Sequence, residues 1–334
     1  MTQEPNFANV LSMTRNPEPE TNVGVFAVKP MDKWIDEAAQ RPDPQPLFDS
    51  LWCEGCFCIF FAPTNVGKSA LAYQIADALT TGRPIPHFDM PTTPRPVLYI
   101  DYEMSDKQIE LRYRDNEMNH RQFSPLFYRA EFLPDSFTDE EIIKSIEACV
   151  EEYKTKTIIV DNITCLSNNG TEKSNEALPL MKSLLKLCRE NEGLSILVLA
   201  HTPKRDNWAP LTLNDLKGSS DLANLSRDIF TMGKSRKAPN CRYIKQLKQT
   251  NVASTYGEEN IIVGRLEKVG DALQFIFDEY GNERDHLKQQ EMPDDLREYN
   301  IRQAKLMAAS GKSQREIAIE LGVAVGTINK YLNS

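Results

Sequence analysis

Apolar and polar positions along the chain fall into blocks that predict strands and helices in alternation. Four short apolar runs, rich in β-branched and aromatic residues, have the length of buried strands. They are residues 56–61, 97–101, 157–161 and 195–201, and segments with helical spacing of apolar residues separate them. Such alternation is typical of an α/β domain with a doubly wound, mostly parallel sheet. In such a sheet the carboxyl ends of the strands lie at one edge, where ligands bind.

The pattern changes after residue 228, where strand-like segments follow one another without helices between them. Those segments are residues 228–232, 242–248, 261–268 and 272–277. Gly270-Asp271, between the last two, is a dipeptide typical of hairpin turns. We therefore expect C-terminal β-hairpins to extend the α/β sheet.

The two ends of the chain differ from this middle part. Residues 1–45 are rich in Pro, Asn, Glu and Thr, which predicts a mostly flexible arm with a short helix near 31–40. Residues 283–295 are polar and predict a linker. Beyond it, a helix over 296–310, a capping box at 313–316 and a helix near 325–332 predict a small all-α helix-turn-helix domain. The expected domains are thus 1–45, 46–282 and 296–334, with the linker before the last.

The composition is that of a globular protein, with 40% hydrophobic and 26% charged residues. No run of 18 apolar residues predicts a membrane span, and residues 1–30 lack the apolar core of a secretory signal. The lack of an apolar span predicts no membrane partner, and seven cysteines without a secretory signal predict reduced thiols in the cytoplasm. Cys53, Cys56 and Cys58 would suit zinc or redox chemistry, or plain packing beside a strand. No second pair of Cys or His lies at metal-ligand spacing, which favours packing.

The formal net charge of −9 argues against a protein that coats nucleic acid without specificity, but local basic sites remain compatible with it. The tail after residue 293 differs from the acidic chain as a whole, because it carries six basic and five acidic residues. Thr327, Asn329 and Lys330 on its last predicted helix are polar residues suited to contact DNA. A trio of helices used for protein contacts is the alternative.

One segment carries a phosphate-binding pattern. It runs Ala62-Pro63-Thr64-Asn65-Val66-Gly67-Lys68-Ser69, directly after the first predicted strand and before a helix-patterned segment. In such a P-loop, backbone N–H groups and the helix N-terminus bind the phosphates of ATP, Lys68 reaches the β- and γ-phosphates, and Ser69 ligates Mg²⁺. Ala62 replaces the usual first glycine. An ordinary glycine-poor turn is the alternative, which the strand–loop–helix context disfavours.

Polar residues follow the other three predicted strands, at the edge where a nucleotide would lie. Glu103 follows the strand at 97–101 and is either a general base that polarises the attacking water or a solvated carboxylate. Asp161 ends the apolar run at 157–161, after a P-loop and a helical crossover, and is expected to hold the Mg²⁺ shell across from Ser69. His201 ends the next strand and is either a sensor of the γ-phosphate or a structural histidine.

A basic stretch lies among the later strands. A charge run is usually a solvated loop and strand edge. In an acidic protein, this clustering favours cations that reach DNA phosphates or the γ-phosphate of a neighbouring subunit. The members of the stretch are Lys234, Arg236, Lys237, Arg242, Lys245 and Lys248.

With these motifs assembled, residues 46–282 resemble the RecA-like P-loop ATPases of the hexameric replicative helicase group, most of all the RepA-type proteins of plasmids and mobile elements. Glu103-Met104-Ser105 is similar to the Glu-Met-Pro segment of replicative helicases, whose glutamate is the catalytic base. Thr81-Gly82-Arg83-Pro84 is similar to a segment after the P-loop helix in RepA-type proteins. Lys245-Gln246-Leu247-Lys248-Gln249-Thr250-Asn251 is similar to the family's Lys-Gln-Arg-Asn hairpin, whose lysine and arginine reach the neighbouring subunit's ATP.

The resemblance implies a Mg²⁺-dependent ATPase that forms a homo-oligomeric ring, a hexamer, and moves on single-stranded DNA as a helicase. Duplex DNA would be contacted by the helix-turn-helix. Thr250 stands where the family has arginine and cannot replace a bidentate guanidinium. Either another cation, such as Arg242 or Arg227, assists Lys248, or activation across the subunit interface is weak. The alternative is an ATP-switched DNA-binding loader or regulator that does not unwind DNA. The catalytic residues implied are Lys68, Glu103, His201 and, across the subunit interface, Lys248.

Overall fold

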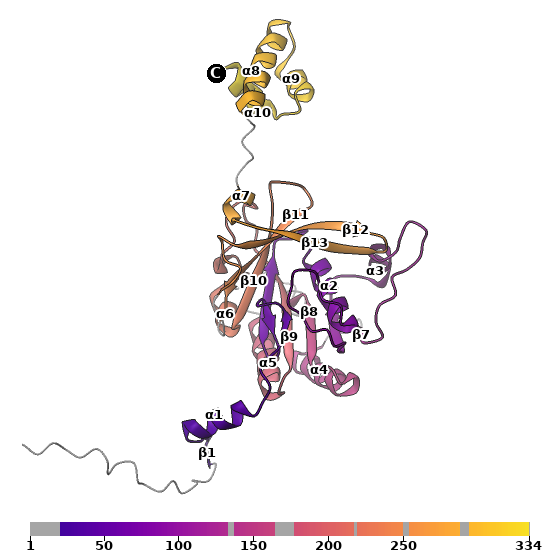
Figure 1. Cartoon of the computed structure of the whole chain (residues 1–334), viewed down its shortest axis with the longest axis vertical. Coiled ribbons are helices and arrows are strands. Elements are labelled where there is room, and N and C mark those ends of the chain that lie inside the picture. Colours follow the sequence, from indigo (N-terminus) through magenta and orange to yellow (C-terminus); the bar gives the residue numbers. More distant parts are fainter. Residues whose placement is uncertain are drawn as a thin grey trace, which may run out of the picture. The chain divides into compact units, whose positions relative to one another are not determined.

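The computed structural model describes residues 21–132, 137–163, 177–216, 219–249, 254–287 and 294–333. The chain divides into two compact units, Met1–Pro44 and Gln45–Ser334. A nine-stranded sheet forms the centre of the second unit (Figure 1). Its strands are β5 (Phe57–Ala62), β6 (Val97–Asp101), β7 (Phe127–Glu131), β8 (Thr157–Asp161), β9 (Ser195–His201), β10 (Asp228–Lys234), β11 (Cys241–Lys248), β12 (Ile261–Val269) and β13 (Ala272–Gly281).

The sheet is mostly parallel. Strands β10, β5, β9, β8, β6 and β7 lie side by side in that order, and all pairs among them are parallel. Strands β11, β12 and β13 continue the sheet beyond β10 as antiparallel neighbours. The predicted fold class, an α/β doubly wound sheet with C-terminal β-hairpins, is therefore confirmed. Because the parallel strands point the same way, their carboxyl ends form a single edge.

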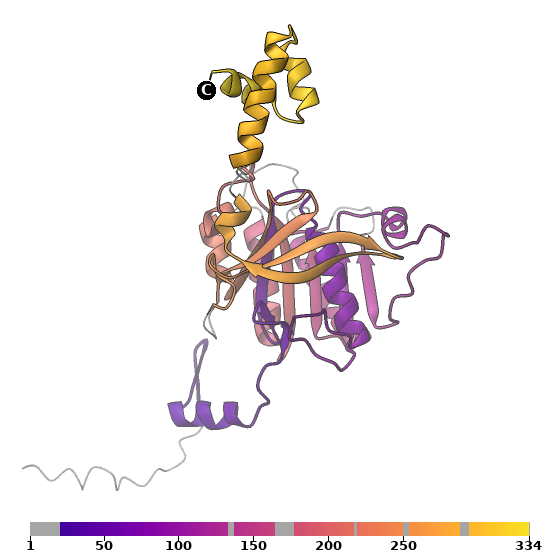
Figure 2. The same cartoon turned by 45° about the horizontal axis from the view of Figure 1, so that its top comes forward.

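Helices cover both faces of the central parallel strands, which explains why β5, β8 and β9 are almost entirely buried and mostly apolar. On one face, α2 (Lys68–Thr81) packs against the sheet and against the β12–β13 hairpin, which crosses in front of it in Figure 2. On the other face lie α4 (Asp139–Tyr153), α5 (Ala177–Glu190) and α6 (Ser219–Leu225). Successive residues of β5 alternate between these two cores: Phe60 faces α2, whereas Ile59 and Phe61 face α5 and α6.

Smaller elements complete this unit. Ser105 caps α3 and Thr138 caps α4, each in a capping box. Within the described ranges, no helix has the length and apolar content needed to cross a membrane. The remaining elements are β3 (Pro46–Phe48), β4 (Trp52–Cys53), α3 (Asp106–Arg112), the 3₁₀ turn η3 (Leu213–Asp215) and α7 (Glu283–Leu287).

The sequence patterns did not predict β7, α6 or α7. Strand β7 is only half-buried and carries a charged residue, Arg129, in its middle, so it lacks the apolar run of its neighbours. Helix α7 occupies the start of the segment expected to be a linker, because Glu283 and His286 are buried against the unit. Strand β7 and helix α7 are short, and they form because of contacts with other parts of the chain, which a local sequence pattern does not show.

In the first unit the described residues form a two-stranded sheet, β1 (Thr21–Val23) and β2 (Phe26–Val28), and the helix α1 (Met31–Ala39). The helix confirms the prediction of a short helix near 31–40. None of its residues is buried, and Trp34 is 41% exposed. An ion pair of 2.8 Å joins Lys29 to Glu37.

The C-terminal residues form three helices, α8 (Asp294–Ala309), α9 (Gln314–Glu320) and α10 (Val325–Leu332). Ile317, Ile328 and Tyr331 are buried among them, together with Ala304. The capping box that starts at Ser313 opens α9, as predicted. On α10, Asn329 and Lys330 are exposed and Thr327 is half-buried. A helix-turn-helix that binds DNA stays a prediction for these helices.

Candidate active site

The segment from Ala62 to Ser69 joins the end of β5 to the start of α2, which is the connection that a phosphate-binding loop requires. Gly67 is the N-cap of α2 and is left-handed, with φ of 105°. A Cβ atom at this position would lie 2.9 Å from Cζ of Phe275 on β13. Both the turn and the packing of the β12–β13 hairpin therefore require glycine at position 67.

Lys68 is buried at the first position of α2, and its Nζ lies 3.3 Å from Nδ1 of His201. The two residues meet because β5 and β9 are adjacent parallel strands and Ala62 is in register with His201. The first N–H groups of a helix have no intrahelical partner and carry its positive end. An ammonium group held next to them is suited to bind an anionic phosphate chain.

Asp161 is fully buried at the end of β8, and its Oδ2 accepts a 2.7 Å hydrogen bond from the Tyr99 hydroxyl. Burial raises the pKa of Asp161, while the Ser69 hydroxyl and the Lys68 ammonium act in the opposite direction. Oδ1 has no hydrogen-bond partner among the described residues. A buried carboxylate oxygen without a partner, close to a serine hydroxyl, fits the oxygen ligands of a Mg²⁺ ion that is bound together with ATP. Ser69 and Asp161 are thus the residues that would hold this ion.

Glu103, Asn162 and His201 form a hydrogen-bonded cluster at the same edge. Oε1 of Glu103 lies 2.8 Å from Nε2 of His201 and accepts a hydrogen bond from the side-chain amide of Asn162. The hydrogen bond with His201 is the main cause of the lowered pKa of Glu103, and Lys68 adds to it against the effect of burial. An ionised carboxylate that is 31% exposed is suited to accept a proton from a water molecule beside the phosphates.

The structure therefore brings the predicted residues of four strand ends to one place, although their roles stay predictions. It also adds Asn162 and Tyr99, which the sequence patterns missed. Asn162 directly follows Asp161 at a strand end, so its polarity and position were a usable indication. Nothing in the sequence indicates that the hydroxyl of Tyr99, inside an apolar run, meets a carboxylate 62 positions away.

Two cations of the basic stretch have buried internal partners. Lys245 is 5% exposed, and its Nζ lies 2.5 Å from Oε2 of Glu283 in α7. Arg242 is also buried, and its Nε donates to the carbonyl of Val66 in the P-loop at 2.8 Å. In this chain Lys245 and Arg242 are therefore held inside the unit, whereas a contact of the basic stretch with DNA or with a neighbour's phosphate stays a prediction. A charged group taken out of water needs partners nearby, and these are supplied by the chain itself.

Lys248 is half-buried, and its Nζ donates to the carbonyl oxygens of Ala223 and Ser226, each at 2.8 Å. These carbonyls lie at the C-terminal end of α6, where a cation is favourable. Thr250, at the position where the resembling family has arginine, lies outside the described residues. The action of Lys248 on a neighbouring subunit's ATP stays a prediction.

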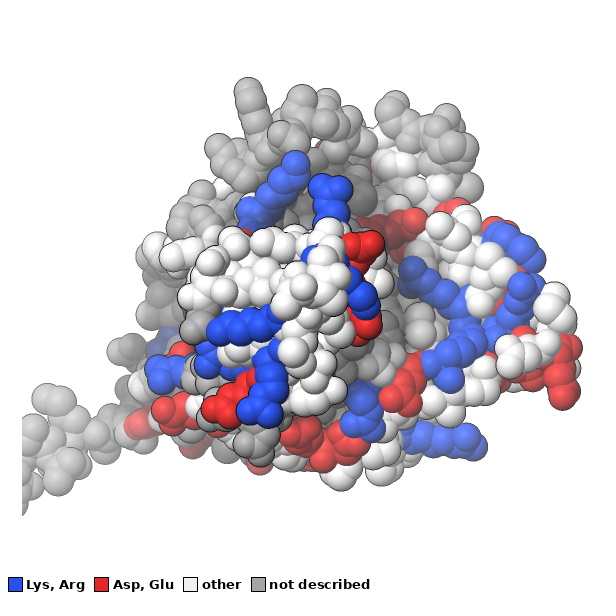
Figure 3. Space-filling model, turned by 90° about the horizontal axis from the view of Figure 1, so that it is seen from above, with Lys and Arg blue, Asp and Glu red and all other residues white. Residues whose placement is uncertain are grey.

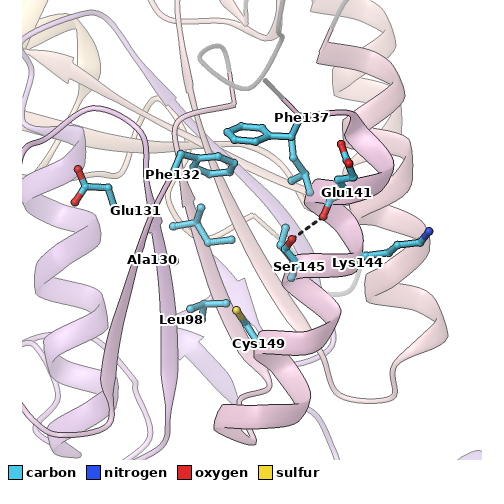
Figure 4. A pocket seen from close by; sticks show the side chains of 12 residues that line it. Leu98, Ala130, Glu131, Phe132, Phe137, Glu141, Lys144, Ser145 and Cys149 are labelled. Carbon is cyan, nitrogen blue, oxygen red and sulfur yellow. Dashed lines mark hydrogen bonds between the residues drawn. The ribbon is translucent and has the colours of Figure 1, made fainter. Parts of the chain in front are cut away.

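A separate cavity of about 600 Å³ lies between β6, β7 and α4 (Figure 4). Most of its lining is apolar, as at Leu98, Phe132 and Phe137. Glu131, Glu141, Lys144 and Ser145 also line it, and in Figure 4 the Lys144 side chain points away from the cavity. None of the P-loop residues borders it. Nζ of Lys144 is paired with Glu140 at 2.8 Å, and the two glutamates of the lining would repel phosphates, so the sheet edge and not this cavity is the candidate active site.

The six cysteines in the described part of the chain are free thiols. Burial raises the pKa of Cys56 to about 12, so its thiol stays protonated at neutral pH. In the same part of the chain, no group of three or more His, Cys, Asp or Glu side chains could hold a metal ion. The burial of Cys56 and Cys58 agrees with the packing interpretation of Cys53, Cys56 and Cys58.

The sheet order, the loop after β5 and the polar strand ends define a P-loop nucleotide-hydrolysing protein. The profile of a family described as an AAA domain matches residues 26–207, which is more than half of the 334-residue chain. The chain therefore belongs to this AAA domain family, whose members are P-loop ATPases. The comparison with curated proteins gave no match.

Among solved structures, the crystal structure of a KaiC-like protein from the hyperthermophilic archaeon Pyrococcus horikoshii OT3 is similar to this chain. The TM-score is 0.51 at 12% sequence identity, and the alignment covers 70% of this chain and 96% of that chain. Identity this low shows the fold alone, which is that of the RecA-like ATPases.

Proposed function

We propose that this chain is a Mg²⁺-dependent ATPase that assembles into a homo-oligomeric ring, a hexamer, and moves on single-stranded DNA in the cytoplasm. Its activity would be that of a replicative-type helicase of a plasmid or other mobile element. The observation that carries the hydrolytic part is the meeting of Lys68, Glu103 and Asp161 at one edge of the sheet, with a buried oxygen of Asp161 left without a partner in the described part. The DNA and ring parts depend on the sequence resemblance.

Each residue has a task in this proposal. Lys68 and the N–H groups of the P-loop bind the phosphates, and Glu103 accepts a proton from the attacking water. His201 contacts both Lys68 and Glu103. A γ-phosphate bound by Lys68 would therefore lie next to His201, which could sense its loss. Ser69 and Asp161 hold the metal ion. When bound, Mg²⁺ neutralises negative charge on the phosphate oxygens.

DNA contact is proposed at local sites. On the face seen in Figure 3, Lys and Arg side chains are interspersed with Asp and Glu side chains, as expected for a chain of net charge −9. A surface of mixed charge does not attract nucleic acid along its whole length. The exposed Asn329 and Lys330 on α10, with Thr327 beside them, are the candidates for duplex contact.

A second candidate function is an ATP-switched DNA-binding loader or regulator that does not unwind DNA. One observation favours it: Nζ of Lys248 is used inside its own chain, at the end of α6, instead of projecting outward. A ring helicase of this group needs a cation that reaches across the subunit interface. An arginine finger is worth roughly 10³-fold or more in the rate of phosphoryl transfer.

Strand displacement on a forked DNA duplex with ATP and Mg²⁺ tests the proposal. We expect wild-type protein to hydrolyse ATP faster with single-stranded DNA and to separate the strands, and Lys68→Ala to do neither. Lys186→Ala, which removes an exposed lysine of α5, is the matched control and should behave as wild type. Hydrolysis stimulated by DNA, without strand separation at any protein concentration, would contradict the helicase and support the loader.

Two further measurements separate the remaining parts of the proposal. Mass in solution with ATP and Mg²⁺ should correspond to a ring, and a strict monomer would exclude any action of Lys248 on a neighbour. Alanine at Asn329 and Lys330 should weaken binding to duplex DNA while ATP hydrolysis without DNA stays unchanged. Lys305→Ala, which removes an exposed charge from α8, is the control for a purely electrostatic effect.

A further inference from the structure

A buried carboxylate, Asp101, holds the turn that carries Glu103. Asp101 ends β6 and is 2% exposed. Its Oδ1 accepts hydrogen bonds from the backbone N–H groups of Glu103 and Met104, both at 3.0 Å. Its Oδ2 accepts a hydrogen bond of 3.0 Å from the Tyr73 hydroxyl and one of 3.2 Å from Nε of Arg129. Both carboxylate oxygens are therefore engaged, by groups from three different elements.

Arg129 provides a second hold on the same turn. From β7, its Nη2 donates to the carbonyl of Met104 at 2.5 Å, while its Nε is bound to Asp101. The residue after Glu103 is thus held at its N–H group by Asp101 and at its carbonyl by Arg129. A planar guanidinium can make both contacts at once because its N–H groups form a rigid fork.

Tyr73 connects this turn to the phosphate-binding loop. It lies on α2, the helix that begins with Lys68, and a helix is a rigid spacer over so short a distance. The Tyr73 ring packs on the Tyr99 ring with centroids 4.4 Å apart, and the Tyr99 hydroxyl holds Asp161. Two neighbouring tyrosines therefore each hold one strand-end carboxylate, one at the turn of Glu103 and the other at the candidate metal site.

We propose that Asp101, together with Tyr73 and Arg129, is a positioning residue that fixes Glu103 relative to the P-loop. The inference rests on the proposed role of Glu103 as the base. A buried ion pair is weak evidence for stability, since an apolar replacement of the same shape is often as stable. Here the contacts of Asp101 converge on one turn, so they set where the Glu103 carboxylate lies. A misplacement of about 1 Å can lower a catalytic rate roughly 100-fold.

The first test is Asp101→Asn in the full chain. In asparagine one carboxylate oxygen becomes an NH₂ group, which cannot accept hydrogen bonds from the N–H or guanidinium donors around it. The turn that carries Glu103 therefore loses part of its support. We expect kcat for ATP to fall about 10- to 100-fold, while the affinity for ADP stays within about twofold because the P-loop is untouched. Thermal unfolding shows whether the variant is folded. A loss of ADP affinity as large as the loss in kcat would overturn the inference.

Two tyrosine variants provide a milder, matched pair. Tyr73→Phe removes only the hydroxyl on Asp101, and Tyr99→Phe removes only the hydroxyl on Asp161. We expect Tyr73→Phe to lower kcat without changing the Mg²⁺ concentration needed for half-maximal rate. Tyr99→Phe should raise that concentration. Equal effects of both variants on both quantities would mean that the ring stack is merely structural and would overturn the inference.

A double-mutant cycle separates this inference from the proposed function. If Asp101 acts through Glu103, adding Asp101→Asn to Glu103→Gln should lower the single-turnover rate by less than about twofold further. A further drop as large as that in the wild-type background would overturn the positioning role alone. Wild-type kcat in Glu103→Gln would overturn the base role, and the inference with it. If Glu103→Gln is inactive but Asp101→Asn keeps wild-type kcat, only the inference fails.

Discussion

Nε2 of His201 lies 2.8 Å from Oε1 of Glu103, and Nδ1 of the same ring lies 3.3 Å from Nζ of Lys68. One imidazole therefore joins the residue proposed to activate water to the residue proposed to bind phosphate. Without nucleotide, these three side chains satisfy one another. A γ-phosphate bound at Lys68 would compete for the same groups, so nucleotide binding is expected to change the partners of Glu103.

His201→Ala tests this connection through pH. His201 is the main cause of the lowered pKa of Glu103, so its removal should raise that pKa toward the ordinary range of a glutamate. A base must be ionised to act, and kcat/KM reports the free enzyme, so the acidic limb of the kcat/KM profile should move to higher pH. Profiles of wild type and variant that coincide on the acidic side would contradict the connection. His120→Ala, at an exposed histidine outside the site, is the control.

Asp161→Asn should stabilise the nucleotide-free protein at pH 7. Burial raises the pKa of Asp161, so the folded state binds the proton more tightly than the unfolded state. The ionised carboxylate therefore opposes folding above its folded-state pKa, and this penalty disappears as pH falls below the unfolded-state value near ~4. We expect a gain in the free energy of unfolding of roughly 0.5–2 kcal/mol at pH 7, typical of relieving one strained functional group.

Urea denaturation at several pH values between neutral and acidic conditions checks this expectation, and the gain should shrink as pH decreases. Asp278→Asn, at an exposed carboxylate on β13, should show no such pH-dependent gain. If Asp161→Asn were less stable than wild type at pH 7, the carboxylate would have a structural role that outweighs its burial. The same variant should lose ATP hydrolysis, since the candidate metal site loses its charge.

Gly67→Ala should impair both nucleotide binding and folding. The left-handed backbone disfavours any Cβ by roughly 1–2 kcal/mol, and at this position the new atom also meets Phe275. Gly55→Ala is the matched control, because Gly55 is left-handed as well but a Cβ added there would have no other atom within 4 Å. We expect Gly55→Ala to cost only the backbone term and to keep full affinity for ADP. Equal destabilisation by both variants would show that the hairpin contact has no effect.

Much of the fold could be predicted from local patterns, because the length and apolar content of a strand and the residues of a turn lie within a few consecutive positions. The parallel strands β5, β6, β8 and β9 are apolar runs of the right length, and the turn at Gly270-Asp271 joins β12 to β13. Strand β7 was missed because its middle residue, Arg129, is polar for a reason that lies elsewhere in the chain. Its partner, Asp101, is 28 positions away, and a pairing at that distance leaves no periodicity in the sequence.

In the candidate site, too, the positions of some residues could be predicted from the sequence, whereas their contacts could not. Residues at the ends of apolar runs, such as Asp161 and His201, could be predicted because all parallel strands end at the same edge. Contacts between side chains could not be predicted, and they decide what a charged residue does. Lys245 belongs to a basic stretch in the sequence, yet it is buried against a glutamate of a helix that no pattern indicated.

That buried pair gives the last prediction. Glu283→Ala would leave the ammonium of Lys245 buried without its carboxylate, which is expected to lower the free energy of unfolding by roughly 3–5 kcal/mol. The double variant Lys245→Met with Glu283→Leu removes both charges, so it should recover part of that loss, while the Leu211 N–H loses the carboxylate that accepts its hydrogen bond. Urea denaturation at pH 7 measures both, with Glu190→Ala, from an exposed pair on α5, as the control. If Glu283→Ala were as stable as wild type, the Lys245 ammonium would be able to reach solvent without its partner. Lys245 could then be exposed and available to bind DNA.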